Sequence, residues 1–296
     1  MSSTIGFIGL GIIGLPMAER LLERGIPLVV WNRTPEKAED LVRRGARRAA
    51  SAAELAAQAD VVVTMVTDGP ALEKIALGAS GIAASLTAGK VHCDMSTIDP
   101  GTSRRLAAHY AARGAHFVHA PVLGSKRAAA TGTLLIFAGG SKEALEKCAP
   151  AFAALGKKTW EWDRAETATG VKLACNLLLA GMMELFAESL VLAGKSGVPV
   201  ETMLEILAAS ALATQMYQTK GEAIAARNFT PNFYLRNMLK DLNLVLDSGK
   251  DLGLDLPGTR AVRGAFAAAA DAGLAEEDYC AVIQWLERQA ARAPAR

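Results

Sequence analysis

The stretch TIGFIGLGIIGLPMAERLLERG, residues 4–25, decides the fold class of this chain. A short strand-like run leads into Gly9-Leu10-Gly11-Ile12-Ile13-Gly14, and a helical pattern follows the glycines. In that context Gly9 permits a tight turn, Gly11 lets a pyrophosphate approach the backbone, and Gly14 lets the helix pack on the strand. The unpaired N–H groups that begin the helix suit phosphate oxygens. The stretch therefore predicts a dinucleotide-binding site, and the alternative is a glycine-rich turn that binds nothing.

Short β-rich runs alternate with helical stretches from residue 4 to about 162, which favours a parallel sheet covered by helices. Helix starts are expected at Thr34-Pro35 and Asp99-Pro100, and a capping box at Ser51 to Glu54. From about residue 168 the pattern is helical throughout, beginning with one long helix over about 168–195. We expect two domains, residues 1–163 and 164–296. The strand-like runs are TIGFIG, IPLVVWN, DVVVTMV, KVHCDMS, AHFVHAP, TLLIFAG and KTWEW.

Composition excludes several classes of protein. The formal net charge of +2 over 296 residues argues against nucleic acid as a partner. The apolar run at 173–194 is long enough to span a bilayer, but Asn176, Glu184 and Glu188 favour a buried helix and no membrane. The four cysteines lie far apart, without metal-ligand spacing, and the N-terminus lacks a basic leader, so we expect a cytoplasmic protein without a metal. The apolar long helix also suggests a homodimer or homotetramer.

The turn after the second strand-like run indicates which dinucleotide binds. An acidic residue there would hold the ribose 2′-hydroxyl of NAD, whereas a cation accepts the 2′-phosphate of NADP. The chain has Asn32, Arg33 and Thr34 at this turn and no carboxylate. The guanidinium of Arg33 suits phosphate, and its two neighbours can add neutral donors. These residues predict NADP(H), unless Arg33 is only a solvated surface charge.

Five collinear motifs resemble those of the β-hydroxyacid dehydrogenases. The loop GSKRAAATGTL at 124–134 is most similar to the glyoxylate/succinic semialdehyde reductase branch, which favours NADPH. The resemblance implies an α/β Rossmann-type domain followed by an all-α domain like the C-terminal domain of 6-phosphogluconate dehydrogenase. It also implies reduction of a small aldehyde or 2-oxo acid that carries a carboxylate, with the site between the domains. The motifs are GFIGLGIIGLPMAERLLERG, DMSTIDPGTS (94–103), APVLGSKRAAATGTL (120–134), GVKLACN (170–176) and LKDLNLVLD (239–247).

By this resemblance Lys172 is the catalytic residue, and an ammonium group can stabilise the alkoxide that forms on a carbonyl oxygen and then donate the proton. Asn176 lies one helical turn further on, where it can orient the substrate or the lysine. The resemblance assigns the cofactor to Met65, Val66, Thr67, Thr97 and Lys240, in addition to the glycine loop and residues 32–34. It assigns the substrate to Ser96, Val122, Leu123, Gly124, Phe233 and Asp241.

Two positions depart from the family pattern. Leu123 stands where many relatives have a serine that helps to hold the substrate carboxylate, which leaves the identity of the substrate open. His119 replaces a frequent acidic residue, and the sequence assigns it no role. The alternatives are a 3-hydroxyisobutyrate-type dehydrogenase, an imine reductase, and a non-catalytic NADP-binding sensor or scaffold. Lys172 argues against the last two, because imine reductases generally lack it and a scaffold does not need it.

Overall fold

The computed structural model describes residues 3–292, and these residues divide after Leu173 into two compact units. The boundary between these compact units falls inside one long helix, α8 (Ala165–Lys195). The sequence predicted this helix over about 168–195, and the structure confirms it.

The first unit is built on one sheet, and all seven predicted strand-like runs are strands in it. The order across the sheet is β3-β2-β1-β4-β5-β6-β8-β7, with β9 paired to β8. The sequence missed two strands of two residues each, β3 and β7. The strands are β1 (Ile5–Ile8), β2 (Leu28–Trp31), β3 (Arg47–Arg48), β4 (Val61–Thr64), β5 (Val91–Asp94), β6 (His116–His119), β7 (Val122–Leu123), β8 (Leu134–Gly139) and β9 (Gly156–Trp162).

The sheet is parallel from β3 to β6 but not throughout. Strand β8 runs antiparallel to β6 and β7, and β9 is parallel to β8. Only the short helix α6 (Lys126–Thr131) separates β7 from β8, which is too little chain for the crossover that a parallel pair needs. The prediction of a parallel sheet is therefore correct for the half that carries the glycine loop and wrong for the last strands.

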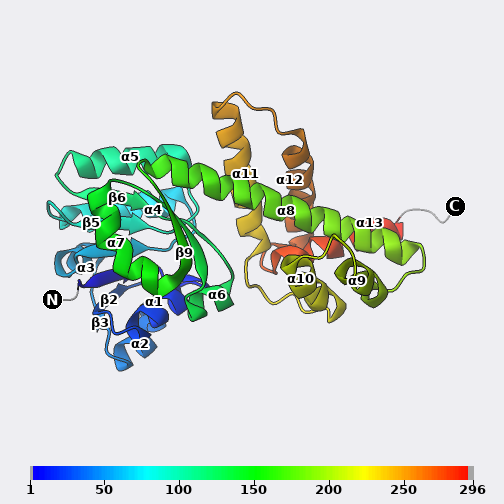
Figure 1. Ribbon diagram of the computed structural model, residues 1–296, viewed down its shortest axis with the longest axis horizontal. Helices are drawn as coiled ribbons and strands as arrows, with labels where there is room; N and C mark the ends of the chain where they lie inside the picture. Colours follow the sequence, from blue (N-terminus) through cyan, green and yellow to red (C-terminus); the bar gives the residue numbers. More distant parts are fainter. Residues whose placement is uncertain (1–2, 293–296) are drawn as a thin grey trace. The chain divides into compact units, whose positions relative to one another are not determined.

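Helices cover both faces of this sheet (Figure 1). Phe7 packs into the core on one face and the next residue, Ile8, into the core on the other, as the two-residue period of a strand requires. Central strands buried on both faces explain why the β-rich runs are continuously apolar. The helices are α1 (Gly14–Glu23), α2 (Glu39–Arg43), α3 (Ala52–Gln58), α4 (Gly69–Leu77), α5 (Pro100–Ala111), α6 and α7 (Lys142–Leu155).

Two of the three predicted helix starts are confirmed. The hydroxyl of Ser51 accepts a hydrogen bond from the N–H of Glu54, and the Asp99 carboxylate accepts one from Thr102 at 2.7 Å. Thr34 does precede a proline at the first helical position, but its side chain makes no capping bond and the segment Pro35–Ala38 is a 3-10 helix. The turn at Thr34 is therefore held in another way.

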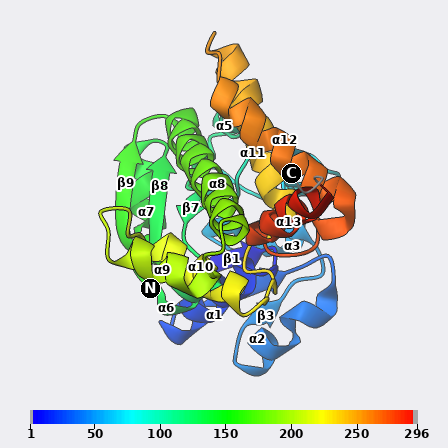
Figure 2. The same cartoon turned by 90° about the vertical axis from the view of Figure 1, so that its right-hand side faces the viewer.

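The second unit is helical, as predicted. Its helices pack around one apolar core that includes Met183, Phe186 and Phe266. Helices α11 and α12 lie side by side (Figure 2). Among the described residues α8 is the one helix long and apolar enough to cross a membrane, a test that the core helix of a soluble protein also passes. The helices after α8 are α9 (Val200–Ala208), α10 (Gln215–Ala225), α11 (Leu235–Asp251), α12 (Pro257–Ala269) and α13 (Val282–Arg292).

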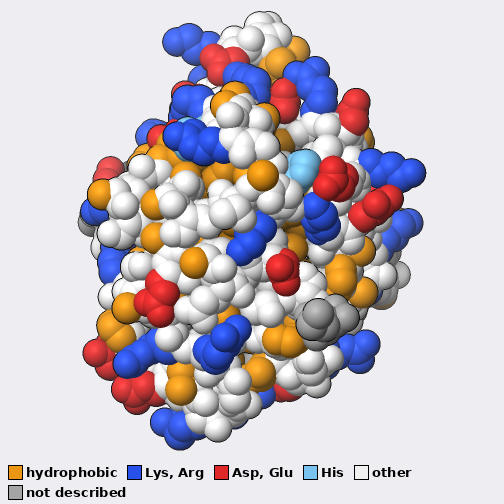
Figure 3. All heavy atoms as spheres, turned by 90° about the vertical axis from the view of Figure 1, so that its left-hand side faces the viewer, with side chains coloured by type: hydrophobic (Ala, Val, Ile, Leu, Met, Phe, Trp, Pro, Cys, Tyr) orange, Lys and Arg blue, Asp and Glu red, His pale blue; other side chains and the backbone are white. Residues whose placement is uncertain are grey.

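The balanced composition is visible on the surface. On the face shown in Figure 3, Lys and Arg side chains are interspersed with Asp and Glu side chains, and neither sign gathers there. This agrees with a net charge of +2.

Candidate active site

The loop between β1 and α1 uses its three glycines in three different ways. Gly9 has a φ of +100°, and a Cβ there would lie 2.2 Å from the carbonyl oxygen of Met65. A Cβ on Gly14 would lie 1.9 Å from the carbonyl oxygen of Gly9, so this glycine lets the helix pack against the strand end. A Cβ on Gly11 would meet no atom within 4 Å. The chain's own packing does not require a glycine at 11, and the open space beside it fits a ligand that approaches the backbone closely.

The start of α1 also fits an anionic ligand. Its N-cap residue, Ile13, makes no side-chain capping bond, and the first turn carries no acidic residue. The first N–H groups of a helix have no partner within the helix and sit at the positive end of its dipole. Together with the space at Gly11, these features form a phosphate cradle of the kind that dinucleotide-binding folds use.

Asn32 ties the turn after β2 to the glycine loop. Its side-chain oxygen accepts a hydrogen bond from the N–H of Leu10 at 2.9 Å, and its amide donates to the carbonyl of Thr34 at 2.9 Å. Asn32 therefore holds the turn in place of the missing Thr34 cap. Arg33 is exposed at this turn, at the end of β2 beside the cradle, where its guanidinium is accessible to a ligand.

Ser96 connects the segments that follow β4 and β5. Its hydroxyl accepts a hydrogen bond from the N–H of Val66 at 2.8 Å and donates to Asp94 at 2.8 Å. Because a hydroxyl has one proton and this side chain is fully buried, the hydroxyl of Ser96 is engaged within the chain. Thr97 is half-buried and Thr67 is exposed at the same edge of the sheet.

The sequence missed a buried polar cluster at the carboxyl ends of β4, β5 and β6. Thr64 donates to Asp94 at 2.6 Å, and the ring of His92 lies 3.0 Å from the Thr64 hydroxyl. The ring of His119 contacts Thr169 at 2.6 Å and the Ser96 carbonyl at 3.1 Å. A signal was present, because polar residues alternate in β5 where a central strand is normally apolar throughout.

Burial keeps both of these histidines neutral at pH 7. It lowers the pKa of His92 to about 3 and that of His119 to about 4. A neutral imidazole carries one N–H. In His119 that proton belongs on Nε2, which faces the Ser96 carbonyl and the Asp94 carboxylate, so Nδ1 accepts from Thr169. His119, to which the sequence assigned no role, thus links the end of β5 to the first turns of α8.

Two residues of the predicted substrate loop form a short strand. Val122 and Leu123 pair with β8, and a Cβ on Gly124 would lie 2.7 Å from the side chain of Leu134. Leu123 is half-buried and Gly124 is exposed. Pairing with β8 gives this segment a fixed backbone, as a carboxylate-binding element requires.

Lys172 lies on α8 with only 7% of its surface exposed. It precedes Asn176 by one turn of the same helix, so both side chains project from one face. A lysine with little access to water can act as a proton donor to a bound ligand.

Three predicted residues of the second unit contact one another. The Asn176 amide donates to Asp241 at 2.6 Å, and Lys240 Nζ lies 2.8 Å from the other carboxylate oxygen of Asp241. The side chain of Asp241 is 1% exposed and that of Lys240 is 23% exposed, so this ion pair is partly buried rather than a helix-surface pair. Phe233, just before α11, packs edge-to-face on Tyr279 with ring centroids 6.1 Å apart.

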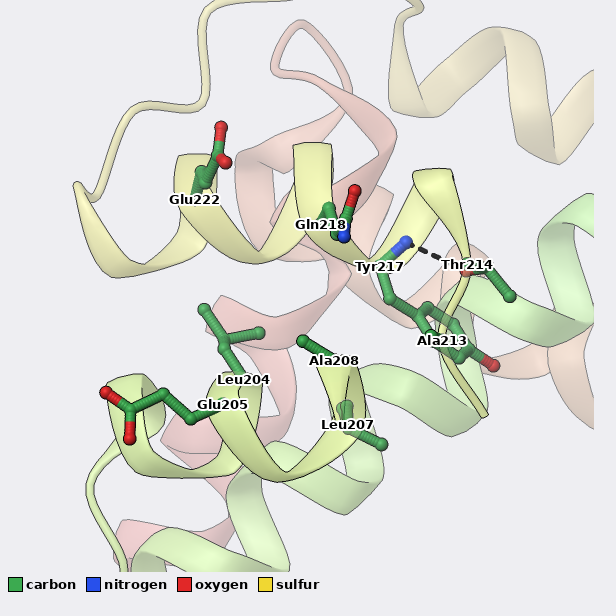
Figure 4. Close-up of a pocket in the computed structure, with 9 residues that line it drawn as sticks. All are labelled: Leu204, Glu205, Leu207, Ala208, Ala213, Thr214, Tyr217, Gln218 and Glu222. Atoms are coloured by element: carbon green, nitrogen blue, oxygen red, sulfur yellow. Dashed lines mark hydrogen bonds between the residues drawn. The ribbon is translucent and has the colours of Figure 1, made fainter. Parts of the chain in front are cut away.

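The second unit also has a groove that contains none of the predicted residues. It lies between α9 and α10, has a volume of 390 Å³ and is lined mostly by apolar side chains, with Tyr217 held through a bond from its N–H to Thr214 (Figure 4). Among the residues that line it are Leu204, Leu207 and Ala208.

The comparisons with known proteins agree with this geometry. Residues 4–164 match the NAD binding domain of 6-phosphogluconate dehydrogenase, and residues 167–286 match the NAD-binding region of NADP-dependent 3-hydroxyisobutyrate dehydrogenase. The chain is 36% identical over 280 residues to glyoxylate/succinic semialdehyde reductase 1 of Arabidopsis thaliana, covering 95% of this chain and 97% of that protein.

Two solved structures extend the comparison. The 3-hydroxyisobutyrate dehydrogenase of Salmonella typhimurium superposes with a TM-score of 0.89 at 27% identity, covering 96% of this chain and 99% of that one. Psf3, in complex with NADP+ and 2-OPP, superposes with a TM-score of 0.88 at 25% identity, covering 96% and 100%. The fold and the glycine loop define an NAD(P)-dependent oxidoreductase with a nicotinamide dinucleotide cofactor. Within that class, the chain belongs to the β-hydroxyacid dehydrogenase family.

Proposed function

We propose that this protein uses NADPH to reduce a small carboxylate-bearing aldehyde or 2-oxo acid, with glyoxylate and succinic semialdehyde as the leading substrates, and that Lys172 is the general acid. The observation that carries the proposal is a lysine with 7% exposure one helical turn before a buried asparagine. The relatives named glyoxylate/succinic semialdehyde reductase support the choice of substrates.

The chain's own groups divide the work. The nicotinamide supplies the hydride when the cofactor is bound. The ammonium of Lys172 stabilises the negative charge that develops on the substrate oxygen and donates the proton that completes the hydroxyl group. Asp241 accepts from the Asn176 amide and so fixes the orientation of that side chain beside the lysine's helical face.

The cofactor preference rests on the turn after β2. Arg33 is exposed there, and residues 32–34 include no carboxylate that would repel a 2′-phosphate. The cradle at Gly11 and the uncapped start of α1 hold the pyrophosphate. We expect Arg33→Ala to raise the Michaelis constant for NADPH about tenfold or more while changing that for NADH little.

Substrate recognition is the least constrained step. The hydroxyl of Ser96 is engaged with Asp94 and Val66, and Leu123 cannot donate a hydrogen bond. Backbone N–H groups of the segments around residues 96 and 122 are then the donors we propose for the carboxylate. A pocket with few side-chain donors also keeps a 3-hydroxyisobutyrate-type dehydrogenase or an imine reductase as alternatives.

The deciding assay measures the oxidation of NADPH and of NADH with glyoxylate, succinic semialdehyde and a cyclic imine. The oxidation of 3-hydroxyisobutyrate is followed in the reverse direction, by the reduction of NADP+ or NAD+. We expect turnover with the two aldehydes and a preference for NADPH. Lys172→Ala should lower kcat by about 100-fold or more and leave the dissociation constant of NADPH within about threefold. A clear preference for NADH would refute the cofactor assignment, and tight NADPH binding without turnover of any substrate would favour the scaffold.

A matched pair of variants tests the cradle. Gly11→Ala adds a methyl group that meets no atom of the chain, so it should leave the fold intact and weaken NADPH binding about tenfold or more. Gly264→Ala, in α12, also meets no atom within 4 Å and should change neither property. Equal NADPH affinity in the two variants would contradict the placement of the pyrophosphate at Gly11.

A further inference from the structure

The second unit contains a buried ion pair that the proposed reaction does not use. Lys220, on α10, places its Nζ 2.7 Å from Oδ1 of Asp278, which precedes a short 3-10 helix, η4 (Tyr279–Ala281). The two side chains are 11% and 2% exposed. Because burying two charges costs about as much free energy as their attraction returns, such a pair does little for stability, and its best attested role is to fix one arrangement of the chain.

The carboxylate of Asp278 holds the segment that joins α10 to α11. Its Oδ2 accepts hydrogen bonds from the backbone N–H groups of Asn232 at 3.0 Å and of Phe233 at 3.3 Å. Its Oδ1 accepts from Lys220 and, at 3.1 Å, from the N–H of Cys280. Each oxygen thus has two donors, which is the full capacity of a carboxylate. The backbone of Phe233 is therefore bonded to a buried charge whose other partners are also fixed.

The carbonyl and the ring of Phe233 are held by Tyr279, the residue after Asp278. The Tyr279 N–H donates to the Phe233 carbonyl at 2.9 Å, and the two rings pack edge to face. Lys220 Nζ lies 4.4 Å from the centroid of the Tyr279 ring, in a cation–π contact. Lys220 therefore contacts both groups that hold Phe233, the carboxylate and the tyrosine ring. Phe233 itself is only half-buried, which leaves part of its surface accessible to a ligand.

The residues around Asp278 also hold the start of α11. The N-cap residue of this helix, Tyr234, makes no side-chain capping bond. The N–H of Leu235 donates instead to the carbonyl of Glu277 at 2.8 Å. Because the first N–H groups of a helix have no partner within the helix, a bond to another segment fixes where the helix begins. Phe233 is therefore held on both sides, by the bonds to its own backbone and by the anchored helix that follows.

We propose that Lys220 and Asp278 are positioning residues for Phe233, and that they fix its backbone and its ring so that its accessible part meets the substrate. The inference rests on the proposed function, in which Phe233 contacts the substrate. A binding group that is already held in one place loses little conformational freedom when the substrate arrives, so its contact contributes more to affinity. Loosening Phe233 should therefore weaken substrate binding without changing the proton donor.

The test measures kcat and KM for succinic semialdehyde in the full chain with saturating NADPH. Lys220→Met removes the ammonium, and Asp278 loses its counter-charge but keeps its backbone donors. We expect KM to rise about tenfold, kcat to fall by less than about threefold, and the dissociation constant of NADPH to stay within about threefold. Leu207→Ala is the matched control, because Leu207 is a buried residue of the same core, on α9, and makes none of these bonds. It should lower the melting temperature and leave KM unchanged.

A double variant separates positioning from stability. If Lys220 acts on the substrate only through Phe233, then Lys220→Met should raise KM no further in a chain that already carries Phe233→Ala. Effects that multiply would mean that the ion pair acts on the whole unit, and would overturn the inference. An unchanged KM in Lys220→Met, beside a raised KM in Phe233→Ala, would overturn it and leave the proposed function standing. An unchanged KM in Phe233→Ala would refute the substrate role of Phe233, and the inference with it.

Hydrogen exchange tests the positioning without a substrate. In Lys220→Met the amides of the segment between α10 and α11 should exchange about tenfold faster, while those of α9 keep the wild-type rate. Leu207→Ala should show the opposite pattern. Equal protection of that segment in the wild type and in Lys220→Met would overturn the inference, whichever substrate the protein reduces. Should Lys220→Met not fold, Lys220→Met combined with Asp278→Asn carries neither charge of the pair and keeps one acceptor oxygen, and we expect the same rise in KM and the same faster exchange.

Discussion

The contact between His119 and Thr169 yields a quantitative prediction for the replacement His119→Phe. The phenyl ring is planar like the fully buried imidazole and one heavy atom larger, but it cannot bond to the Thr169 hydroxyl or to the Ser96 carbonyl. The Thr169 hydroxyl can turn to the carbonyl of Ala165, 3.3 Å away, whereas the Ser96 carbonyl loses a donor inside the protein. One unsatisfied buried group and one lost hydrogen bond together cost about 2–3 kcal/mol of the free energy of unfolding.

The assay is urea unfolding of wild type, His119→Phe, Thr169→Val and the double variant at pH 7.5. Thr169→Val removes the same side-chain contact from the other residue. The sum of the losses in free energy of unfolding in the two single variants should therefore exceed the loss in the double variant by about 1 kcal/mol. His119→Gln keeps an amide donor near the position of Nε2 and should recover about half of the loss. Ser125→Ala serves as a control, because Ser125 is exposed and makes only a long capping bond of 3.4 Å.

Two results would refute this assignment. A loss below about 0.5 kcal/mol in His119→Phe would mean that the ring contributes volume alone. Strict additivity of His119→Phe and Thr169→Val would mean that the 2.6 Å contact between their side chains contributes no free energy. Either outcome would leave the first turns of α8 without a polar link to the end of β5.

Three further predictions follow from burial and packing. Gly14→Ala places a methyl group 1.9 Å from a backbone carbonyl oxygen and should lower the free energy of unfolding by about 3 kcal/mol or more, as measured by urea unfolding. Gly11→Ala should leave the free energy of unfolding unchanged. Burial lowers the pKa of His92 to about 3 and that of His119 to about 4, so below pH 6.5 the folded state binds fewer protons at these two side chains than the unfolded state does. Their contribution to the free energy of unfolding, measured with urea, should therefore fall by several kcal/mol from pH 7 to pH 4. Burial, and secondly the neighbouring carboxylate of Glu188, raise the pKa of Glu184 to about 7, so this group destabilises the folded state as the pH rises. Glu184→Gln should therefore raise the free energy of unfolding by about 1–2 kcal/mol at pH 8, seen as a higher melting temperature, and leave it nearly unchanged at pH 4.

The sequence predicted those elements whose signals are local. Glycine spacing, strand length and the caps at Ser51 and Asp99 depend on residues within a few positions of one another, and the structure bears them out. The failed cap at Thr34 is also instructive. Its place is taken by Asn32, whose oxygen bonds to Leu10, 22 residues away, and no local pattern reports that contact.

The sequence did not predict the antiparallel strands or the buried polar cluster, because both depend on residues far apart in the chain. Strand β8 runs antiparallel because only the short helix α6 connects it to β7, a strand of two residues that the sequence pattern did not reveal. Asp94 accepts hydrogen bonds from the hydroxyls of Thr64 and Ser96, and the ring of His119 bonds to Thr169 on a helix that begins 46 residues later. The residue types were visible in the sequence, but their partners are set by the tertiary fold.

The buried side of helix α8 changes in character along its length. Its buried side follows one continuous spacing of three and four residues, and from residue 180 onward the residues at this spacing are apolar, with Ala180, Met183 and Leu190, while the buried carboxylate of Glu184 lies beside them. Nearer its start the same buried positions carry Thr169, Lys172 and Asn176. Burying polar groups costs free energy unless each finds a partner, so a helix that only joined two units would have continued the apolar pattern. If the proposed function is correct, the polar residues at the start of this buried side, and not the apolar residues that follow them, are the part of α8 that meets the substrate.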